Sequence, residues 1–184
     1  MIEVEQRIMT ILYAPAYYTH ESYLPETFLK DDIWEGTLIN WWLLKHLKLS
    51  NLPNAWQPID TMLSQLIAQW HLIPATAHLI GGYLLRNHLP KQGAVIMSDP
   101  RLLAFISLPL LHQITLDDAF TSPDTVSFGI TFILGQFPEL PVALRQRFLL
   151  HFPSGMKLPQ FPAPKTLNHI NLLRMALVYA HNYY

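Results

Sequence analysis

The chain has 184 residues, of which 51% are hydrophobic and only 14% are charged, so it must bury a substantial apolar surface. This composition excludes an intrinsically disordered protein, and a net charge of −1 without a basic stripe argues against nucleic-acid binding. The chain contains no cysteine, which excludes disulfides, thiolate metal sites and cysteine nucleophiles.

The N-terminal region, residues 1–30, is predicted to form a helix followed by an aromatic turn. Apolar residues from Ile2 to Tyr13 fall on or near one helical face, and Pro15 ends the pattern. Glu3 and Glu5 stand where a signal peptide carries positive charge. We therefore expect a cytoplasmic chain without a targeting segment.

A second helix is predicted from Asp31 to Leu49, because two adjacent aspartates can cap its start and basic residues occupy its last turns. It carries Trp34, Trp41 and Trp42, and the last two lie about 100° apart around a helix. Either one of these two faces the core and the other a flanking element, or one anchors a protein partner. We take the three tryptophans as candidate partner-binding residues.

The stretch between Asp60 and Arg86 contains no charged residue and is long enough to cross a bilayer. Glutamine and histidine residues are scattered through it, however, and Pro74 interrupts it in the middle. These features favour a buried pair of helices from Thr61 to Leu85 over a membrane span. The preceding residues, 50–58, contain two prolines and two asparagines and are predicted to form a loop.

Two start signals predict further helices. Asp99-Pro100 begins one that runs to about His112, and residues 122–124 begin the next. In that next segment, 124–137, apolar residues alternate with smaller or polar ones, which is also a strand pattern. We predict a helix there because of the cap and the helical surroundings, and a strand is the alternative.

The C-terminal part is predicted to contain a helix from Glu139 to Phe152, a proline-rich connection at 153–165 and a terminal helix capped by Thr166. One face of the terminal helix is apolar, formed by Ile170, Leu173, Leu177 and Ala180. The sequence thus predicts an all-α fold: a compact, irregular, single domain over 1–184 with about seven to eight helices.

No group of residues predicts catalysis, a cofactor or a metal site. His71 and His78 are seven residues apart, but Pro74 lies between them and no carboxylate accompanies them. The adjacent pairs Asp31-Asp32 and Asp117-Asp118 would point away from each other on a helix, so capping is the better interpretation. We expect a protein that is not an enzyme and that acts by binding other proteins.

Four stretches of the chain carry motifs in a particular order. The first is an aliphatic run with a proline and a tyrosine pair (Ile11–His20), and the second contains Trp, Pro and Leu-Ile-Gly in that order (Trp70–Ala94). The third is a leucine-rich element with Arg-Phe before Phe-Pro (Leu140–Pro153), and the fourth is an end with a Tyr-Ala step (Leu172–Tyr184). In order and spacing they resemble the OrgA/MxiK family of type III secretion accessory proteins, also called the SctK family, whereas residues 95–135 match poorly.

This resemblance implies a non-catalytic adaptor in the cytoplasmic sorting platform of the type III secretion injectisome. Members of the family connect the cytoplasmic domain of the inner-membrane ring protein (SctD type) to the pod protein (SctQ type). The resemblance therefore implies a role in virulence-related protein secretion at the cytoplasmic face of the inner membrane, without direct membrane insertion. Two alternatives stay open: a small helical ligand-binding protein or enzyme, and a peripheral membrane protein.

Overall fold

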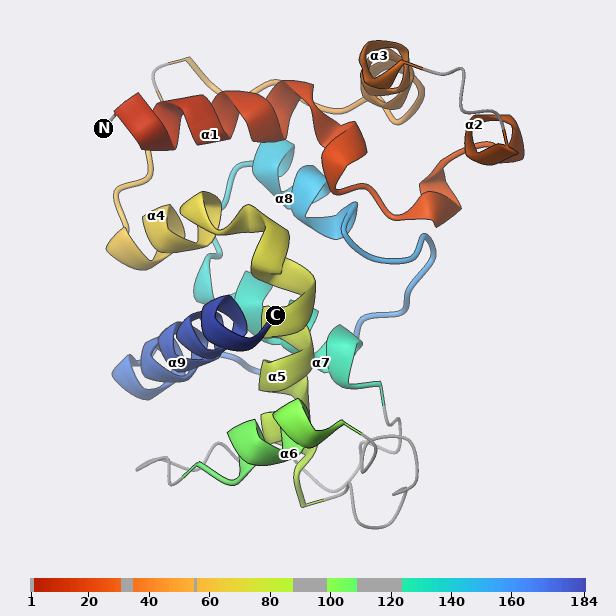
Figure 1. Cartoon of the computed structure of the whole chain (residues 1–184). Coiled ribbons are helices and arrows are strands. Elements are labelled where there is room, and N and C mark those ends of the chain that lie inside the picture. Colours follow the sequence, from red (N-terminus) through yellow and green to blue (C-terminus); the bar gives the residue numbers. More distant parts are fainter. Residues whose placement is uncertain (1, 31–34, 55, 88–98, 109–123) are drawn as a thin grey trace. The chain divides into compact units, whose positions relative to one another are not determined.

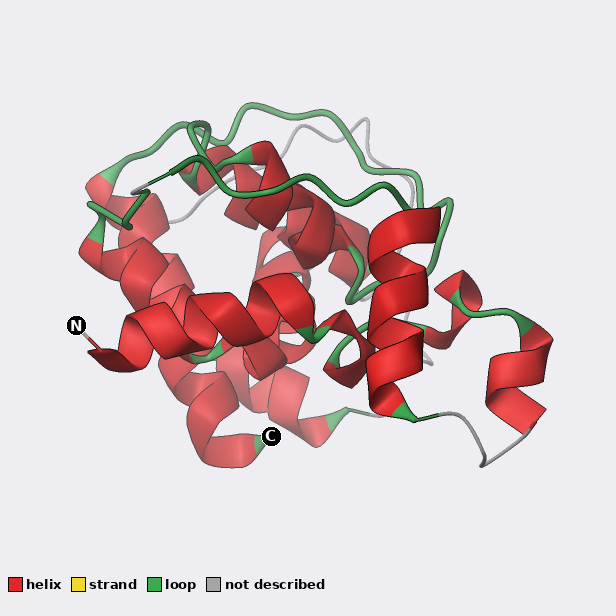
Figure 2. Ribbon diagram, turned by 90° about the horizontal axis from the view of Figure 1, so that it is seen from above, coloured by secondary structure: helices red, strands yellow, loops and turns green. Residues whose placement is uncertain are grey.

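The computed structural model describes residues 2–30, 35–54, 56–87, 99–108 and 124–184, and every regular element in these ranges is helical (Figures 1 and 2). The predicted all-α fold is confirmed, with nine α-helices in the described ranges. Contacts divide the chain into two compact units. Unit 1 consists of Met1–His71 and Glu139–Met156, and unit 2 of Leu72–Pro138 and Lys157–Tyr184. The expectation of a single domain over 1–184 stays a prediction.

Unit 1 is built around its first helix, which packs against α4 and α8, while the short helix η1 packs against α3. Its predicted bounds, Ile2 to Tyr13, are confirmed. The helices of unit 1 are α1 (Ile2–Tyr13), η1 (Pro15–Tyr17), η2 (Glu21–Tyr23), α2 (Glu26–Lys30), α3 (Gly36–His46), α4 (Thr61–Ala68) and α8 (Val142–Leu149). The predicted aromatic turn therefore contains three short helices.

The tryptophan-bearing helix begins later than predicted. Its first residue is Gly36, and Glu35 before it is extended and forms no side-chain cap. The first turn is closed by the backbone alone, because the Glu35 carbonyl accepts hydrogen bonds from the N–H groups of Leu38 and Ile39. The expected start at Asp31 is thus wrong, and the predicted caps Asp31-Asp32 lie outside the described residues.

The uncharged stretch forms the predicted pair of helices. The Asp60 carboxylate caps α4 by accepting from the N–H groups of Met62 and Leu63 at 2.7 and 3.3 Å. The chain leaves α4 at Gln69, passes through η3 (Trp70–Leu72) and enters α5 (Ile73–Leu85), with Pro74 in its first turn. Proline suits that position because its missing N–H would have no helical partner there. No described helix is long and apolar enough to cross a membrane.

In unit 2, α5 is the central helix and packs against the three others (Figure 1). These are α6 (Pro100–Ile106), α7 (Thr125–Gln136) and α9 (Leu167–Tyr183). The predicted caps Asp99 and Thr166 accept backbone hydrogen bonds at the helix start, and in the predicted start signal 122–124 the capping residue is Asp124. The terminal helix buries Leu173, Leu177 and Ala180 of its predicted apolar face.

Segment 124–137 is a helix, so the strand alternative is wrong. Its alternating pattern arises because α7 is buried on most of its circumference and thus lacks a polar face. Gly129 lies so close to α5 that a Cβ there would be 1.8 Å from the Ala77 carbonyl oxygen. A Cβ on Gly81 of α5 would lie 1.6 Å from the Thr125 carbonyl oxygen. Both glycines therefore permit the close packing of α5 and α7.

Two predicted helices are too long at their ends. α6 ends at Ile106 rather than near His112, because the Leu108 N–H bonds the Phe105 carbonyl three residues back, which tightens the last turn. Residues 109–112 lie outside the described part. α8 starts only after Pro141, whose backbone is extended, and ends at Leu149.

The proline-rich connection has no regular structure, as predicted, and part of it is fixed to α7 within unit 2. The Thr131 hydroxyl donates to the Pro159 carbonyl at 3.0 Å, and the Gln136 amide donates to the Ala163 carbonyl at 3.1 Å. The Phe161 ring stacks on Phe128. Residues 157–165 thus form an ordered segment that packs against α7.

The core of unit 1 contains a histidine, His151, that is only 8% exposed. Its ring stacks on Tyr18 at 4.8 Å between centroids and lies against Trp70. Burial, with a smaller contribution from the charge of His71, lowers the pKa of His151 to about 3. The imidazole is therefore neutral in the folded protein at pH 5 to 7.

We expect His151 to make unit 1 acid-sensitive. Between pH 6.5 and 3 the unfolded chain binds a proton at this residue and the folded chain does not, so stability falls as pH falls. From pH 7 to 5 this contributes a loss of about 2 kcal/mol in the free energy of unfolding. Urea unfolding at both pH values should show this loss in the wild type and a smaller one in His151→Leu. The exposed residue His181 offers the control, and equal losses in all three proteins would contradict the assignment.

Candidate partner-binding surfaces

Two of the three candidate tryptophans are described, and they differ in environment. Trp41 is 58% exposed, whereas Trp42 is half-buried, meets the edge of Phe28 and stacks on His46 at 4.3 Å. Trp34 lies outside the described residues. Trp42 thus contributes to packing within unit 1, and Trp41 is available to a partner; its role in binding stays a prediction.

The exposed side of α3 combines apolar and basic side chains, and we call Leu38, Trp41, Lys45 and Lys48 the α3 surface. Leu38 is 42% exposed and lies one helical turn before Trp41, and Lys45 lies one turn after it. The other side of α3 is anchored to unit 1, because Leu43 is fully buried and the Asn40 side chain accepts a hydrogen bond from the Ala16 N–H at 2.8 Å.

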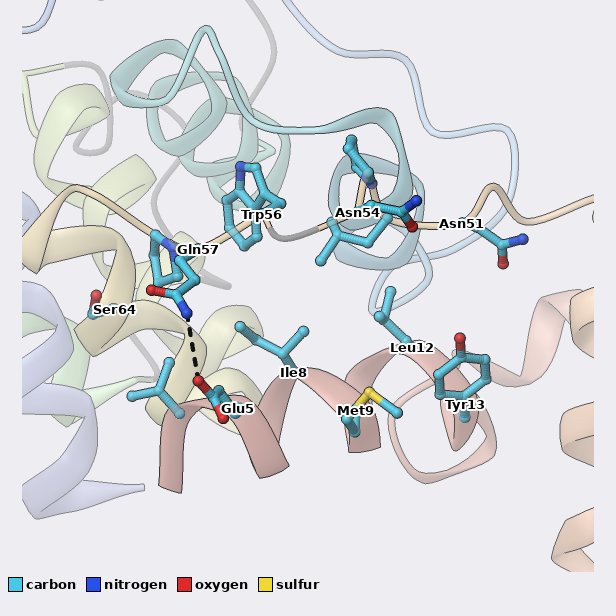
Figure 3. Close-up of a pocket in the computed structure, with 14 residues that line it drawn as sticks. Glu5, Ile8, Met9, Leu12, Tyr13, Asn51, Asn54, Trp56, Gln57 and Ser64 are labelled. Atoms are coloured by element: carbon cyan, nitrogen blue, oxygen red, sulfur yellow. Dashed lines mark hydrogen bonds between the residues drawn. The ribbon is translucent and has the colours of Figure 1, made fainter. Parts of the chain in front are cut away.

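A second apolar surface of unit 1 is a groove of about 730 Å³, which we call the α1 groove (Figure 3). One wall is α1, and the other is the predicted loop, with Ser64 of α4 also contributing. The apolar lining residues are Val4, Ile8, Met9, Leu12, Tyr13, Leu52, Pro53, Trp56 and Pro58.

Polar groups occupy one end and one wall of the α1 groove. Gln57 donates a hydrogen bond to Glu5 at 3.5 Å, which connects the two walls at that end (Figure 3). Asn51 and Asn54 also line the loop wall and are exposed. Met9 is 55% exposed beside the buried Ile8, so the groove combines an apolar floor with amide groups that can bond a peptide backbone.

Both walls of the groove are held by one buried side chain, Arg147 of α8, which is 1% exposed. Its guanidinium donates two hydrogen bonds to the Leu12 carbonyl, at 3.1 and 2.9 Å, and one to the Ser50 carbonyl at 2.9 Å. A fourth hydrogen bond goes to the Ala143 carbonyl. Leu12 lies near the end of the groove wall on α1 and Ser50 immediately precedes the loop wall, so Arg147 connects the two walls.

Arg147 is an unusual buried cation, because its four hydrogen bonds all go to backbone carbonyls and no described carboxylate pairs with it. Burial lowers its pKa. Next to it, burial raises the pKa of Tyr18, whose hydroxyl donates to the Ile11 carbonyl at 2.5 Å. Arg147 and Tyr18 thereby satisfy carbonyls at the end of α1 that have no helical partner.

Comparison with known proteins identifies the family. The family model for the bacterial type III secretion apparatus protein (OrgA_MxiK) matches residues 8–182. The chain belongs to this family. It is 31% identical over 132 residues to the oxygen-regulated invasion protein OrgA of Salmonella typhimurium, in strains 14028s, SL1344 and LT2. The match covers 68% of this chain and 62% of each OrgA, less than two thirds of their length, and no solved structure matches.

In this OrgA/MxiK family member, no group of three potential metal ligands occurs among the described residues. His71 belongs to unit 1 and His78 to unit 2. His78 lies 2.7 Å from the Thr125 hydroxyl and 3.2 Å from the Asp99 carboxylate, a partner that sequence spacing did not reveal. Partial burial raises the pKa of Asp99, but hydrogen bonds from backbone N–H groups and from His78 lower it overall.

The sequence named Trp41 together with Trp34 and Trp42, but it did not indicate the α1 groove or Arg147 in this family member. Arg145, two residues before the buried Arg147, is half-buried. A signal for the groove was present, since Trp56 and two prolines in a short loop indicate an ordered apolar segment. Asp117-Asp118 lie outside the described residues.

Proposed function

We propose that this protein is a non-catalytic adaptor of the type III secretion sorting platform. It links the cytoplasmic domain of the inner-membrane ring protein (SctD type) to the pod protein (SctQ type), at the cytoplasmic face of the inner membrane. The observation that carries this proposal is the exposed Trp41 with Leu38 on α3, in a member of a secretion-apparatus family. Exposed aromatic side chains commonly anchor protein interfaces.

The α1 groove supports the proposal because an adaptor requires a second binding surface. Its apolar floor and exposed amides suit a peptide segment, and its volume lies within the range of about 300–1,000 Å³ of ligand sites. A ligand carrier or enzyme was the alternative, with a pocket that holds several histidines. The described residues that line the groove include no histidine, which favours protein binding.

The two adjacent tryptophans provide the test. We expect Trp41→Ala to weaken binding of one partner about thirtyfold or more at an unchanged melting temperature, because an exposed anchor contributes to binding and not to folding. Trp42→Ala removes contacts with Phe28 and His46, so it should lower the free energy of unfolding by about 2 kcal/mol. Circular dichroism melts measure stability, and pull-down with the purified pod protein and ring-protein domain measures binding.

Leu167→Ala on α9 is the control for loss of an exposed apolar side chain, since Leu167 is 75% exposed and belongs to unit 2. It should change neither readout. In bacteria, deletion of the gene should abolish secretion while the membrane rings still form. Normal secretion by the deletion strain would refute the adaptor role, and full binding of both partners by Trp41→Ala would remove α3 from the interface.

A further inference from the structure

Along the α3 surface, the exposed apolar residues Leu38 and Trp41 come first and the basic residues Lys45 and Lys48 follow. From Gly36 to Ile59 the chain has no acidic residue, and its two lysines are Lys45, in the last turn of α3, and Lys48, two residues after the helix ends. Both are exposed, and neither has a carboxylate partner among the described residues. The α3 surface is therefore positively charged at one end and apolar at the other.

The backbone at Lys48 adds a second observation. Lys48 has a φ of 49°, in the left-handed region, and it is the only non-glycine residue with positive φ in the described part of the chain. Glycine usually follows a helix end in this conformation because it has no Cβ to strain. A lysine at this position accepts that strain, which is consistent with a use for its ammonium group at the surface.

We propose that the α3 surface docks an acidic segment of a partner protein. An apolar side chain of that segment contacts Trp41 and Leu38, while its carboxylates pair with Lys45 and Lys48. Charge complementarity carries this assignment, because a basic end that no described carboxylate neutralises, next to an exposed aromatic residue, selects a negatively charged partner. The inference rests on the proposed adaptor function and specifies the chemistry of one of its partners.

Two other uses of these lysines make different predictions. Cations at the end of a helix also stabilise its dipole, and in that case their removal lowers the melting temperature without affecting binding. Anionic lipid recognition typically uses clusters of about four to eight basic residues. The α3 surface has two, which favours an acidic protein segment over a lipid surface.

The test is photo-crosslinking in secreting bacteria with p-benzoylphenylalanine in place of Leu38, followed by mass spectrometry of the crosslinked peptide. We expect a crosslink to a net-negative segment of another protein. Lys45→Glu/Lys48→Glu should reduce its yield about tenfold or more, because like charges then face each other, and Lys45→Arg/Lys48→Arg should retain it. Lys48→Gly, which relieves the backbone, should raise the melting temperature and still reduce the yield.

Several results would overturn the inference: no crosslink, a crosslink to a neutral or basic segment, or a yield that is unchanged by charge reversal. Binding of the purified protein to phosphatidylglycerol vesicles that is lost in Lys45→Glu/Lys48→Glu would assign the lysines to lipid instead. The gene deletion separates this inference from the adaptor role. If deletion abolishes secretion but charge reversal leaves it intact, only the acidic partner is refuted; if deletion has no effect, the adaptor role itself fails.

Discussion

Replacing Arg147 with methionine should lower the free energy of unfolding by about 3 kcal/mol or more. The substitution removes the desolvation penalty of a buried cation, but it leaves the buried Leu12 carbonyl and the half-buried Ser50 carbonyl without their donors. A buried acceptor without a partner costs about 1–3 kcal/mol, and hydrogen bonds from a charged donor are worth about 1.5–3 kcal/mol each. Methionine fills the space, so the effect reports lost hydrogen bonds and not a cavity. Urea unfolding followed by circular dichroism measures it.

Two variants distinguish the geometry of Arg147 from its charge. Arg147→Lys keeps the charge but cannot donate twice to Leu12 and once to Ser50, so it should recover only part of the stability. Arg7→Met, at an exposed position of α1, should change stability by less than about 0.5 kcal/mol. If Arg147→Met is as stable as the wild type, the four carbonyl contacts do not hold the walls of the α1 groove.

The second large effect is expected where α5 and α7 meet. Gly129→Ala and Gly81→Ala each place a Cβ inside the van der Waals distance of a backbone carbonyl on the opposite helix. Backbone atoms cannot rotate away as a side chain can, so the two helices must separate and lose their packing. We expect each substitution to cost about 3 kcal/mol or more, above the usual range of 1–3 kcal/mol for overpacking. Thermal unfolding of the purified variants provides the measurement.

Gly36→Ala is the matched control, because a Cβ at the first residue of α3 meets no atom within 4 Å. Alanine is favoured over glycine in a helix by about 0.5–1 kcal/mol, so this variant should be slightly more stable than the wild type. Should all three glycine variants behave alike, close approach of α5 and α7 would not explain the glycines.

Local signals in the sequence identified most of the helices. Asp99, Asp124 and Thr166, each part of a predicted start signal, accept hydrogen bonds from N–H groups two or three residues further on, so both partners of each bond lie in the same short stretch of sequence. The bounds of α1 and the break before Pro74 follow from the same kind of local information. Helical geometry allowed either Trp41 or Trp42 to be the exposed residue of the pair. Because Phe28 packs against Trp42, Trp41 is the exposed one.

Features that depend on distant contacts were not predictable in this way. Arg147 bonds a carbonyl 135 positions earlier in the chain, and nothing near either residue indicates the partnership. The α1 groove likewise requires two segments about forty residues apart to face each other with a gap between them. The helical state of α7 was uncertain from its pattern because burial on most sides removes the polar face that periodicity detects.

The interleaving of the two units has a consequence for synthesis of the protein. Residues 1–71 need Glu139–Met156 to complete unit 1, but the ribosome delivers the first stretch of unit 2 in between. The apolar side of α1 therefore emerges from the ribosome long before α8. The Leu12 carbonyl has no donor until Arg147 is synthesised, more than a hundred codons later. Contacts between residues so far apart in the chain form slowly, and until then the exposed apolar side of α1 can aggregate. Neither unit can therefore be produced from one uninterrupted gene fragment without including part of the other.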